Sequence, residues 1–360
     1  MFYNIKPLDT LFFRDGRPFT MSSEMWTSII FPPYPSTIYG AFRSFLIFER
    51  GGLDKFNNGD LKDELGMPEK KGSLHIKGPF ISHKDTLYFP IPKDLVKVEE
   101  KLETLNLSDA KGLFMADYGL EKCLINRYDK KLEEAEGLIS LNDLISYLKA
   151  ENVTIGFEEI GNFYTKEQKV GIKRDRKTLA SEEGFLYKTS TIRLNKNVNI
   201  YFESEGLKNY PDKGVFRLGG EGKLGFFEKS KDSLLKGLDS IEFSFESNMF
   251  KIYLATPSIF EKGWLPSWIN EDTFEGAFNG IKLKLVCCSI GKYVLVGGWD
   301  MARNKPKPMQ RAVPSGSVYY FRLLEETSPD SVKEAFHIKN ISDVNREEGF
   351  GLAFVGGVKL

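Results

Sequence analysis

Residues 217–227, RLGGEGKLGFF, constrain the fold of this chain more than any other stretch. Four glycines fall within seven positions, and apolar residues flank them on both sides, as the ends of two strands would. Glycine is used where the backbone turns at positive φ or approaches another group closely. The stretch therefore predicts a glycine-rich loop between two strands, with Gly219, Gly220, Gly222 and Gly225 as its glycines.

The glycine-rich loop has two uses that fit its residues, and the sequence leaves both open. Successive exposed N–H groups in such a turn can bind a phosphate, whose charge Arg217 and Lys223 would neutralise. The spacing fits neither the GxGxxG pattern nor a P-loop, because no Gly-Lys-Ser/Thr closes it. The other use is a flexible hairpin turn without a ligand.

Composition argues against several classes of protein. The 41% hydrophobic content with 29 phenylalanines supports packed cores, and 360 residues allow two or three domains. A formal net charge of zero argues against coating nucleic acid by bulk charge but leaves room for a local basic face. Three cysteines without a CxxC motif and three scattered histidines give no zinc-site spacing, so we expect no metal and no cofactor. Without a signal-peptide pattern or an apolar run of transmembrane length, we expect a cytoplasmic protein that contacts no membrane.

Two arginines stand out near the N-terminus, in the motif PLDTLFFRDGRPF. Arg14 and Arg17 lie in a predicted turn between apolar pairs, and the guanidinium groups of two arginines can make bidentate hydrogen bonds to phosphates. Pairing of the intervening Asp15 with either arginine explains them equally well. A helix with Ser36 as its N-cap is predicted next, and Arg43 lies off its apolar stripe.

A long hairpin is predicted at about residues 160–194, because strand-like flanks enclose the densest basic run of the chain, KRDRK. A charge run normally marks a solvated face, whereas cations beside aromatic residues also suit an RNA backbone. A second basic run follows Trp299 and Asp300, in a segment that two prolines hold extended. Trp299 with Asp300 is interpreted as a buried structural corner rather than a nucleotide contact. The cations of the two runs are Lys173, Arg174, Arg176 and Lys177, then Arg303, Lys305, Lys307 and Arg311.

Short strands, helices and glycine-rich strands recur in two halves. This pattern favours an α+β fold of two ferredoxin-like (RRM-like, βαββαβ) domains, at residues 1–242 and 243–360. Segments at about residues 51–72 and 93–150 fit no regular part of the pattern and are interpreted as insertions. Within the second of them, a helix capped by Ser140 is predicted.

Six motifs, taken in order, resemble those of one protein family, the third subunit of the Cmr complex. This family belongs to the RAMP superfamily and occurs in type III-B CRISPR systems. The resemblance spans nearly the whole chain and rests on PLDTLFFRDGRPF, PSTIYGAFRS, VGIKRDRKTLASEEGFLY, RLGGEGKLGFF, GGWDMARNKPKPMQRAVPSGSVYYF and GFGLAFVGG. It implies two ferredoxin-like domains with a glycine-rich loop and a protruding β-hairpin. It also implies a non-catalytic RNA-binding subunit that holds the 5′ handle of the CRISPR RNA. The implied protein partners are the large polymerase/cyclase-like subunit and neighbouring RAMP subunits.

The RNA surface expected from this resemblance combines cations with backbone amides, which together suit a single-stranded handle. Its candidate residues are Arg14, Arg17, Arg43, Lys173, Arg174, Arg176, Lys177, Arg217, Gly219, Gly220, Gly222, Lys223, Arg303, Lys305, Lys307 and Arg311.

Two other functions stay open. A CRISPR RNA-processing endoribonuclease of the same superfamily would use His or Tyr with Lys, and Tyr39 or Tyr187 could serve. A purely structural adaptor subunit would bind no RNA. A cyclase or polymerase palm is disfavoured, because Glu221 has no second carboxylate beside it to hold two metals.

Overall fold

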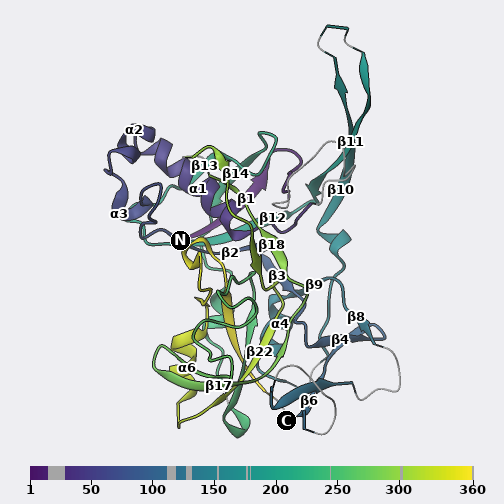
Figure 1. Ribbon diagram of the computed structural model, residues 1–360, viewed down its shortest axis with the longest axis vertical. Helices are drawn as coiled ribbons and strands as arrows, with labels where there is room; N and C mark the ends of the chain where they lie inside the picture. Colours follow the sequence, from purple (N-terminus) through teal and green to yellow (C-terminus); the bar gives the residue numbers. More distant parts are fainter. Residues whose placement is uncertain are drawn as a thin grey trace.

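The computed structural model describes residues 1–14, 29–111, 119–126, 132–151, 154–175, 177–178, 180–243, 245–300 and 303–358, without the side chains of 134, 172–174 and 181–187. The molecule is a mixed α/β structure with two stacked antiparallel sheets, and a long hairpin projects from one end (Figure 1). Among the described residues, no helix is long and apolar enough to cross a lipid bilayer.

The first sheet has the strand order β13-β14-β1-β12-β2-β3-β9, and every pairing in it is antiparallel. Its N-terminal strand β1 is an interior strand that pairs with β12 and β14. The hairpin β10–β11 leaves the body between β9 and β12 along the chain. The bounds are β1 Phe2–Pro7, β2 His75–His83, β3 Thr86–Pro90, β9 Leu138–Ser140, β10 Tyr164–Arg174, β11 Ser181–Leu194, β12 Val198–Glu205, β13 Lys213–Arg217 and β14 Leu224–Lys229.

Helix α1 (Pro35–Glu49) packs against the first sheet through a buried apolar stripe that includes Phe42 and Leu46. The prediction of Ser36 as its N-cap is wrong. Tyr34 occupies the cap position with extended backbone, and Pro35 is the first helical residue. Proline fits there because the N–H that it lacks would have no partner inside the helix.

The second sheet has the order β16-β17-β22-β15-β24-β23, again antiparallel throughout. Helix α6 (Pro329–Phe336) packs against it, and the side chain of Ser328 caps the helix by accepting from the Ser331 N–H. The bounds are β15 Met249–Leu254, β16 Glu275–Phe278, β17 Ile281–Ser289, β22 Val318–Leu323, β23 Lys339–Asn340 and β24 Leu352–Gly357.

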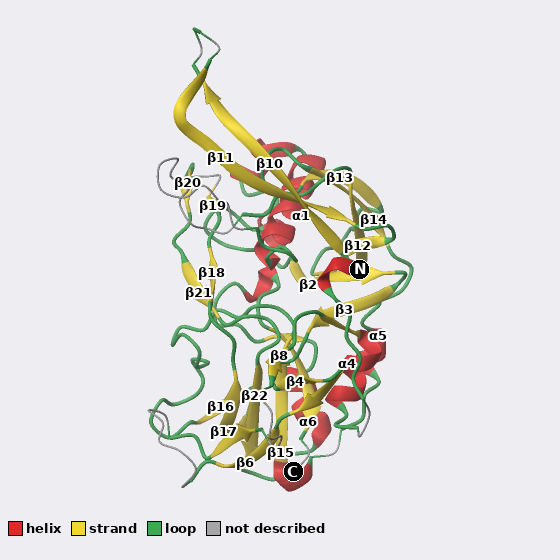
Figure 2. Cartoon of the chain, turned by 90° about the vertical axis from the view of Figure 1, so that its right-hand side faces the viewer, coloured by secondary structure: helices red, strands yellow, loops and turns green. Residues whose placement is uncertain are grey.

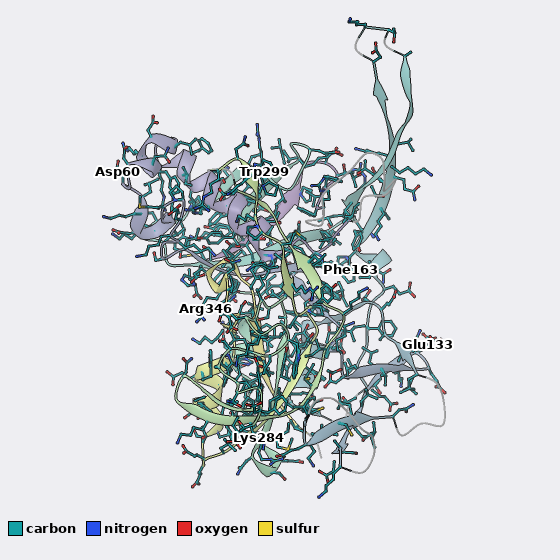
Figure 3. The ribbon with its side chains drawn as sticks, in the orientation of Figure 1. Asp60, Glu133, Phe163, Lys284, Trp299 and Arg346 are labelled. Atoms are coloured by element: carbon teal, nitrogen blue, oxygen red, sulfur yellow. The ribbon has the colours of Figure 1, made fainter. Side chains whose placement is uncertain are left out.

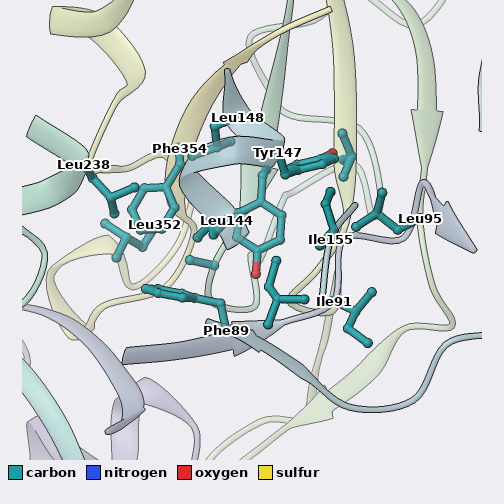
Figure 4. Packing of buried hydrophobic residues seen from close by; sticks show 14 of the residues in the cluster. Phe89, Ile91, Leu95, Leu144, Tyr147, Leu148, Ile155, Leu238, Leu352 and Phe354 are labelled. Atoms are coloured by element: carbon teal, nitrogen blue, oxygen red, sulfur yellow. The ribbon is translucent and has the colours of Figure 1, made fainter. Parts of the chain in front are cut away.

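Helix α4 (Leu141–Leu148) lies between the two sheets (Figure 4). The predicted cap is confirmed, because the Ser140 hydroxyl accepts from the Asp143 N–H at 3.2 Å. The buried face of α4 packs against Phe89 of the first sheet and Phe354 of the second. Strand β9, just before it, is an edge of the first sheet. The end of the segment interpreted as an insertion is therefore part of the core that joins the sheets.

The rest of that segment forms two small sheets beside the main body, and short elements complete the structure. Their bounds are β4 Leu95–Val98, β5 Lys101–Thr104, β6 Asn106–Asp109, β7 Lys122–Ile125, β8 Glu133–Glu134, α2 Gly52–Asn57, α3 Lys62–Leu65, α5 Lys236–Asp239, β18 Val294–Val296, β19 Trp299–Asp300, β20 Lys305–Pro306 and β21 Gln310–Ala312.

A buried polar cluster also ties the 93–150 segment to the second sheet. The carboxylate of Asp94 accepts hydrogen bonds from the hydroxyls of Tyr147 and Tyr320. The ammonium of Lys251, on β15, lies 4.0 Å from this carboxylate and 3.4 Å from the centre of the Tyr147 ring. Burial lowers the pKa of Lys251 to about 8, although the nearby carboxylate opposes the shift.

The segment at residues 51–72 bridges the two halves of the chain. The Lys71 ammonium donates to the Asn345 side chain at 2.7 Å and lies 3.0 Å from the Glu348 carboxylate. Glu348 is itself buried. On its other side, the segment is held by Arg50, which pairs with Glu64 at 3.0 Å.

Candidate nucleic-acid interface

Strands β10 and β11 form a long two-stranded arm that stands clear of the body (Figures 1 and 2). Their pairing is regular from Tyr164 with Leu194 to Ile172 with Leu186. At ~3.3 Å per residue this stretch spans about 30 Å. At the tip, the Asp175 carboxylate accepts from the N–H groups of Lys177 and Thr178, at 2.8 and 2.7 Å. The hairpin predicted at about residues 160–194 is confirmed.

The four predicted tip cations are only partly described. The backbones of Lys173 and Arg174 lie at the end of β10, and Lys177 is exposed in the tip turn. Arg176 lies outside the described residues. The three described positions fall within the tip of the arm, because β10 ends at Arg174 and β11 begins at Ser181.

A short segment, Leu11 to Phe13, joins the base of the hairpin to the glycine-rich loop. Leu11 and Ile192 of β11 exchange two backbone hydrogen bonds, of 2.7 and 2.8 Å. Phe12 pairs with Gly219, and its carbonyl accepts from the Gly220 N–H at 2.9 Å. The two features singled out in the sequence are therefore fixed to one another through the residues before Arg14.

The glycine-rich loop is the turn between β13 and β14, as predicted. Gly219 has φ +79°, and a Cβ there would lie 2.4 Å from the Phe12 carbonyl oxygen. A Cβ on Gly220 would lie 2.8 Å from the Phe12 ring. Gly222 also has positive φ, +65°, but nothing lies within 4 Å of a Cβ built on it. Close packing against Phe12 thus explains two glycines, and the turn itself explains the third.

The cations beside the loop differ in their surroundings. The Lys223 ammonium donates to the Thr10 hydroxyl at 2.9 Å and to the Asp9 carboxylate at 3.2 Å. The Thr10 N–H and then Lys223 hold the pKa of Asp9 down at about 2. Arg217 and Arg14 are exposed, and within the described part of the chain neither has an ion-pair partner. Arg17 lies outside the described residues.

Arg43 is used within the fold. Its guanidinium donates to the carbonyls of Leu65 and Met67, at 2.7 and 3.1 Å, and its Cζ lies 4.9 Å from the centre of the Phe56 ring. Burial lowers the pKa of Arg43. These contacts fasten the 51–72 segment to α1.

The second basic run lies on a C-terminal arm, residues 293–312, built from the pairs β18–β21 and β19–β20 (Figure 2). Figure 3 places Trp299 at the level of the first sheet, far from Lys284 of the second. Arg303 reaches Glu69 of the first half at 2.6 Å, and Arg311 stacks over Tyr293 at 4.8 Å. Within the described residues, the exposed side chains of Lys305 and Lys307 have no ion-pair partner.

Trp299 is exposed, with 51% of its surface accessible, so the interpretation as a buried corner is wrong. It pairs with Pro306 in the two-stranded finger β19–β20. An exposed indole between cations can stack on a planar group. A signal for this lies in the sequence, because Trp299 comes four residues before Arg303, the first cation of the basic run.

A cleft of about 700 Å³ opens beside the hairpin base, and no sequence pattern indicates it. Its walls come from the end of β1 and from the turns β2–β3 and β11–β12. Asp9, which binds Lys223 of the glycine-rich loop, lies in one wall, and Arg193 of the hairpin lies in another. The cleft therefore adjoins both features.

The residues considered for endonuclease chemistry are not gathered in one place. Tyr39 is buried under the first core, where burial raises its pKa to about 12. His337 is buried in the second half, and His75 lies exposed on β2. The side chain of Tyr187 is outside the described set.

Comparison with known proteins identifies the family. A model of the CRISPR-associated protein family Cas_Cmr3 matches residues 3–358. Among solved structures, the chain is similar to a chain of the type III-B Cmr-β complex bound to cognate target RNA, with TM-score 0.52 and 18% identity. A second structure of that complex, bound to cognate target RNA and AMPPnP, gives TM-score 0.51 and 18% identity. In both cases the match covers 89% of this chain and 86% of the other.

A search of curated proteins gives no significant match. At 18% identity, the likeness to the solved complexes concerns the fold. The family model, in contrast, spans nearly the whole sequence, including all six motifs quoted above. The chain belongs to the Cas_Cmr3 family of CRISPR-associated proteins.

Proposed function

We propose that this chain is a non-catalytic RNA-binding subunit of a type III-B Cmr effector complex, in which it holds the 5′ handle of the CRISPR RNA. The observation that carries the proposal is the Leu11–Phe13 segment, which fixes the hairpin base beside the glycine-rich loop. This arrangement supports one continuous surface for a single strand.

The charges near that surface support the same proposal. Exposed cations lie at both ends of the proposed surface, with Lys177 at the hairpin tip and Arg217 and Arg14 at the glycine-rich loop. Lys305 and Lys307 of the C-terminal arm add two more, next to the exposed Trp299. Cations with stacking aromatic residues are the usual means of holding single-stranded RNA. Lys223 and Arg43 act within the fold, by positioning the loop and the 51–72 segment.

The topology supports two ferredoxin-like units. In the first sheet, the order β14-β1-β12-β2 with α1 after β1 has the 4-1-3-2 pattern of a βαββαβ unit that retains its first helix. In the second sheet, β24-β15-β22-β17 with α6 before β24 has the same pattern and retains the second helix. We place the domains at residues 1–242 and 243–360.

We further propose that the faces away from the RNA surface contact the large polymerase/cyclase-like subunit and neighbouring RAMP subunits. This is consistent with the zero net charge, because acidic residues elsewhere can face protein partners. The endoribonuclease alternative is not favoured, because Tyr39 is buried in the first core.

The test is crosslinking in the assembled complex, with a photoreactive group placed in the 5′ handle of the CRISPR RNA. We expect adducts at residues 217–223 and at the hairpin. Handle crosslinks that fall only on other subunits would refute the RNA role and leave a structural adaptor. Site-specific cleavage of precursor RNA by the purified chain would overturn its non-catalytic assignment.

A further inference from the structure

The cleft beside the hairpin base is a built feature of the first sheet. The end of β1 supplies Pro7 and Leu8, and two neighbouring turns supply the other walls. The turn between β2 and β3 contributes Lys84 and Asp85. The turn between β11 and β12 contributes Asn195 and Asn197, and Asn199 follows in β12.

Several polar groups at the cleft already have partners in the fold. Lys6 pairs with Glu228, and Arg193 pairs with Glu167 and Asp9. The amide of Asn195 donates to the Gly161 carbonyl at 2.9 Å. These contacts fix Lys6, Arg193 and Asn195 in the wall of the cleft. The remaining polar lining residues are the groups available to a ligand.

Four polar side chains of the lining have no hydrogen-bond partner among the described residues. They are the amides of Asn197 and Asn199, the ammonium of Lys84 and the carboxylate of Asp85. Unpaired polar groups that converge on a cavity mark it as a candidate binding site.

The backbone that carries the unpaired groups is held in place. Lys84 and Asp85 have φ +51° and +62°, and Asn197 has φ +63°, so both turns adopt a fixed left-handed geometry. The Lys84 N–H donates to the Asn197 carbonyl at 3.4 Å, which joins the turns. Asn199 lies opposite Ser82 in the sheet.

The chemistry of the cleft suits a neutral planar group better than a phosphate. The charges of Lys84 and Asp85 cancel, and the two amides are neutral. An amide offers a donor and an acceptor side by side, which matches the edge of a purine. Leu8, 58% exposed, and Pro7 supply apolar surface for the face of a ring. The volume lies within the range of small-ligand pockets, ~300–1,000 Å³.

We propose that this cleft binds one unstacked purine base of the RNA strand and reads its edge through Asn197 and Asn199. The inference rests on the proposed function, since the strand must first lie along the hairpin base and the glycine-rich loop. Single-stranded RNA offers such bases, because they can be splayed out of the stack and bonded on their edges. The cleft would thus add base selectivity to a surface that otherwise contacts the backbone.

The test measures binding of the full chain to uridine oligonucleotides that carry one adenosine or guanosine at successive positions. Wild-type protein is expected to prefer the purine at one position by about tenfold or more. The double variant Asn197→Ala/Asn199→Ala should lose this preference, so that the purine strands bind it no more tightly than the all-uridine strand does. Asn142→Ala, an exposed asparagine on α4, is the matched control and should change nothing.

Each outcome decides between the two proposals. If wild-type protein binds no strand, the purine cleft is refuted, and the handle crosslinks decide the RNA role separately. If it binds all strands equally, the purine cleft is refuted and the RNA role stands. If the double variant weakens binding of every strand by the same factor, the amides contact the backbone and no base is read. The adenosine and guanosine strands show which purine the cleft prefers.

Discussion

The backbones of Leu11 and Ile192 exchange two hydrogen bonds of 2.7 and 2.8 Å, and both residues are fully buried. Ile192 belongs to the hairpin arm, and the residue after Leu11 pairs with the glycine-rich loop. A change in the loop should therefore alter the local stability of the base of the arm. This relationship gives the first prediction.

Replacement of Gly219 by alanine should destabilise the protein and loosen the hairpin base. The new Cβ would meet the Phe12 carbonyl at 2.4 Å, and φ +79° is unfavourable for alanine. We expect the free energy of unfolding to fall by about 2–4 kcal/mol. Hydrogen exchange of the Ile192 N–H should accelerate. Gly222→Ala has the same backbone strain without the clash and should cost only about 1 kcal/mol. Equal losses for both variants would contradict the packing role of Gly219.

Replacement of the hairpin-tip cations should reduce the salt dependence of RNA binding. Each lost phosphate contact lowers the slope of log K against log salt by about 0.7 for a single strand. The variant changes Lys173, Arg174, Arg176 and Lys177 to serine. Serine at Lys231 and Lys236, two exposed lysines outside the proposed surface, is the control. If the slope changes by the same amount per removed charge in the tip variant and in the control, the tip has no specific role in RNA binding.

Trp299→Ala should weaken RNA binding without changing stability. Stacking of one base on an aromatic side chain contributes about 1–3 kcal/mol, so we expect roughly a 5- to 150-fold loss of affinity. The thermal midpoint should stay unchanged, because the indole is half exposed. Phe48→Ala removes a 64% exposed aromatic ring from α1 and should leave affinity as it is. A lowered midpoint for Trp299→Ala would indicate a structural role instead.

Stability should decrease in mild acid because of His337. Its Nδ1 accepts from the Val355 N–H at 3.0 Å, so its Nε2 carries the proton and donates to the Leu238 carbonyl at 3.0 Å. Burial lowers the pKa of His337 to about 4 from 6.5. Between these pH values the unfolded chain binds more protons than the folded one, so stability is lost as pH falls. The loss should be about 2 kcal/mol between pH 7 and pH 5.

Urea unfolding at several pH values measures this contribution. His337→Asn keeps a side chain that can accept from Val355 but has no imidazole to protonate. This variant should be less stable at pH 7 and should show a shallower decrease towards pH 5. An unchanged decrease would assign the acid sensitivity to other groups.

Loss of the Asp94 carboxylate should be among the most damaging single changes in the core. Asp94→Ala leaves the ammonium of Lys251 buried without its carboxylate, and it removes the acceptor of two tyrosine hydroxyls. We expect about 3–5 kcal/mol of destabilisation. Asp109→Ala removes an exposed partner of Lys122 and should cost less than about 1 kcal/mol. Chemical denaturation compares the two, and similar losses would argue against the buried cluster.

Local signals in the sequence predicted the elements that depend on neighbouring residues. The loop at Gly219 follows from glycine spacing, and the start of α4 follows from the Ser140 cap. The hairpin follows from strand-like flanks around a polar tip. In each case the physical cause lies within a few residues, so pattern alone is sufficient.

The features that sequence reasoning missed depend on contacts between distant segments. Arg43 lies off the apolar stripe of α1, yet the 51–72 segment folds over it and accepts its hydrogen bonds. Trp299 is apolar, but its two-stranded finger leaves it exposed. The pairing of Asp94 with Lys251 and the cleft at Asn199 join elements that no local pattern relates.

The position of α4 between the sheets has a consequence for synthesis on the ribosome. Its apolar face packs partly on β24, which is made roughly 200 residues later, or ~10–40 s at about 5–20 residues per second. During that interval the helix can cover β3 but lacks its other partner. The first half of the nascent chain must therefore wait with an incomplete core and an apolar surface of the kind that chaperones recognise.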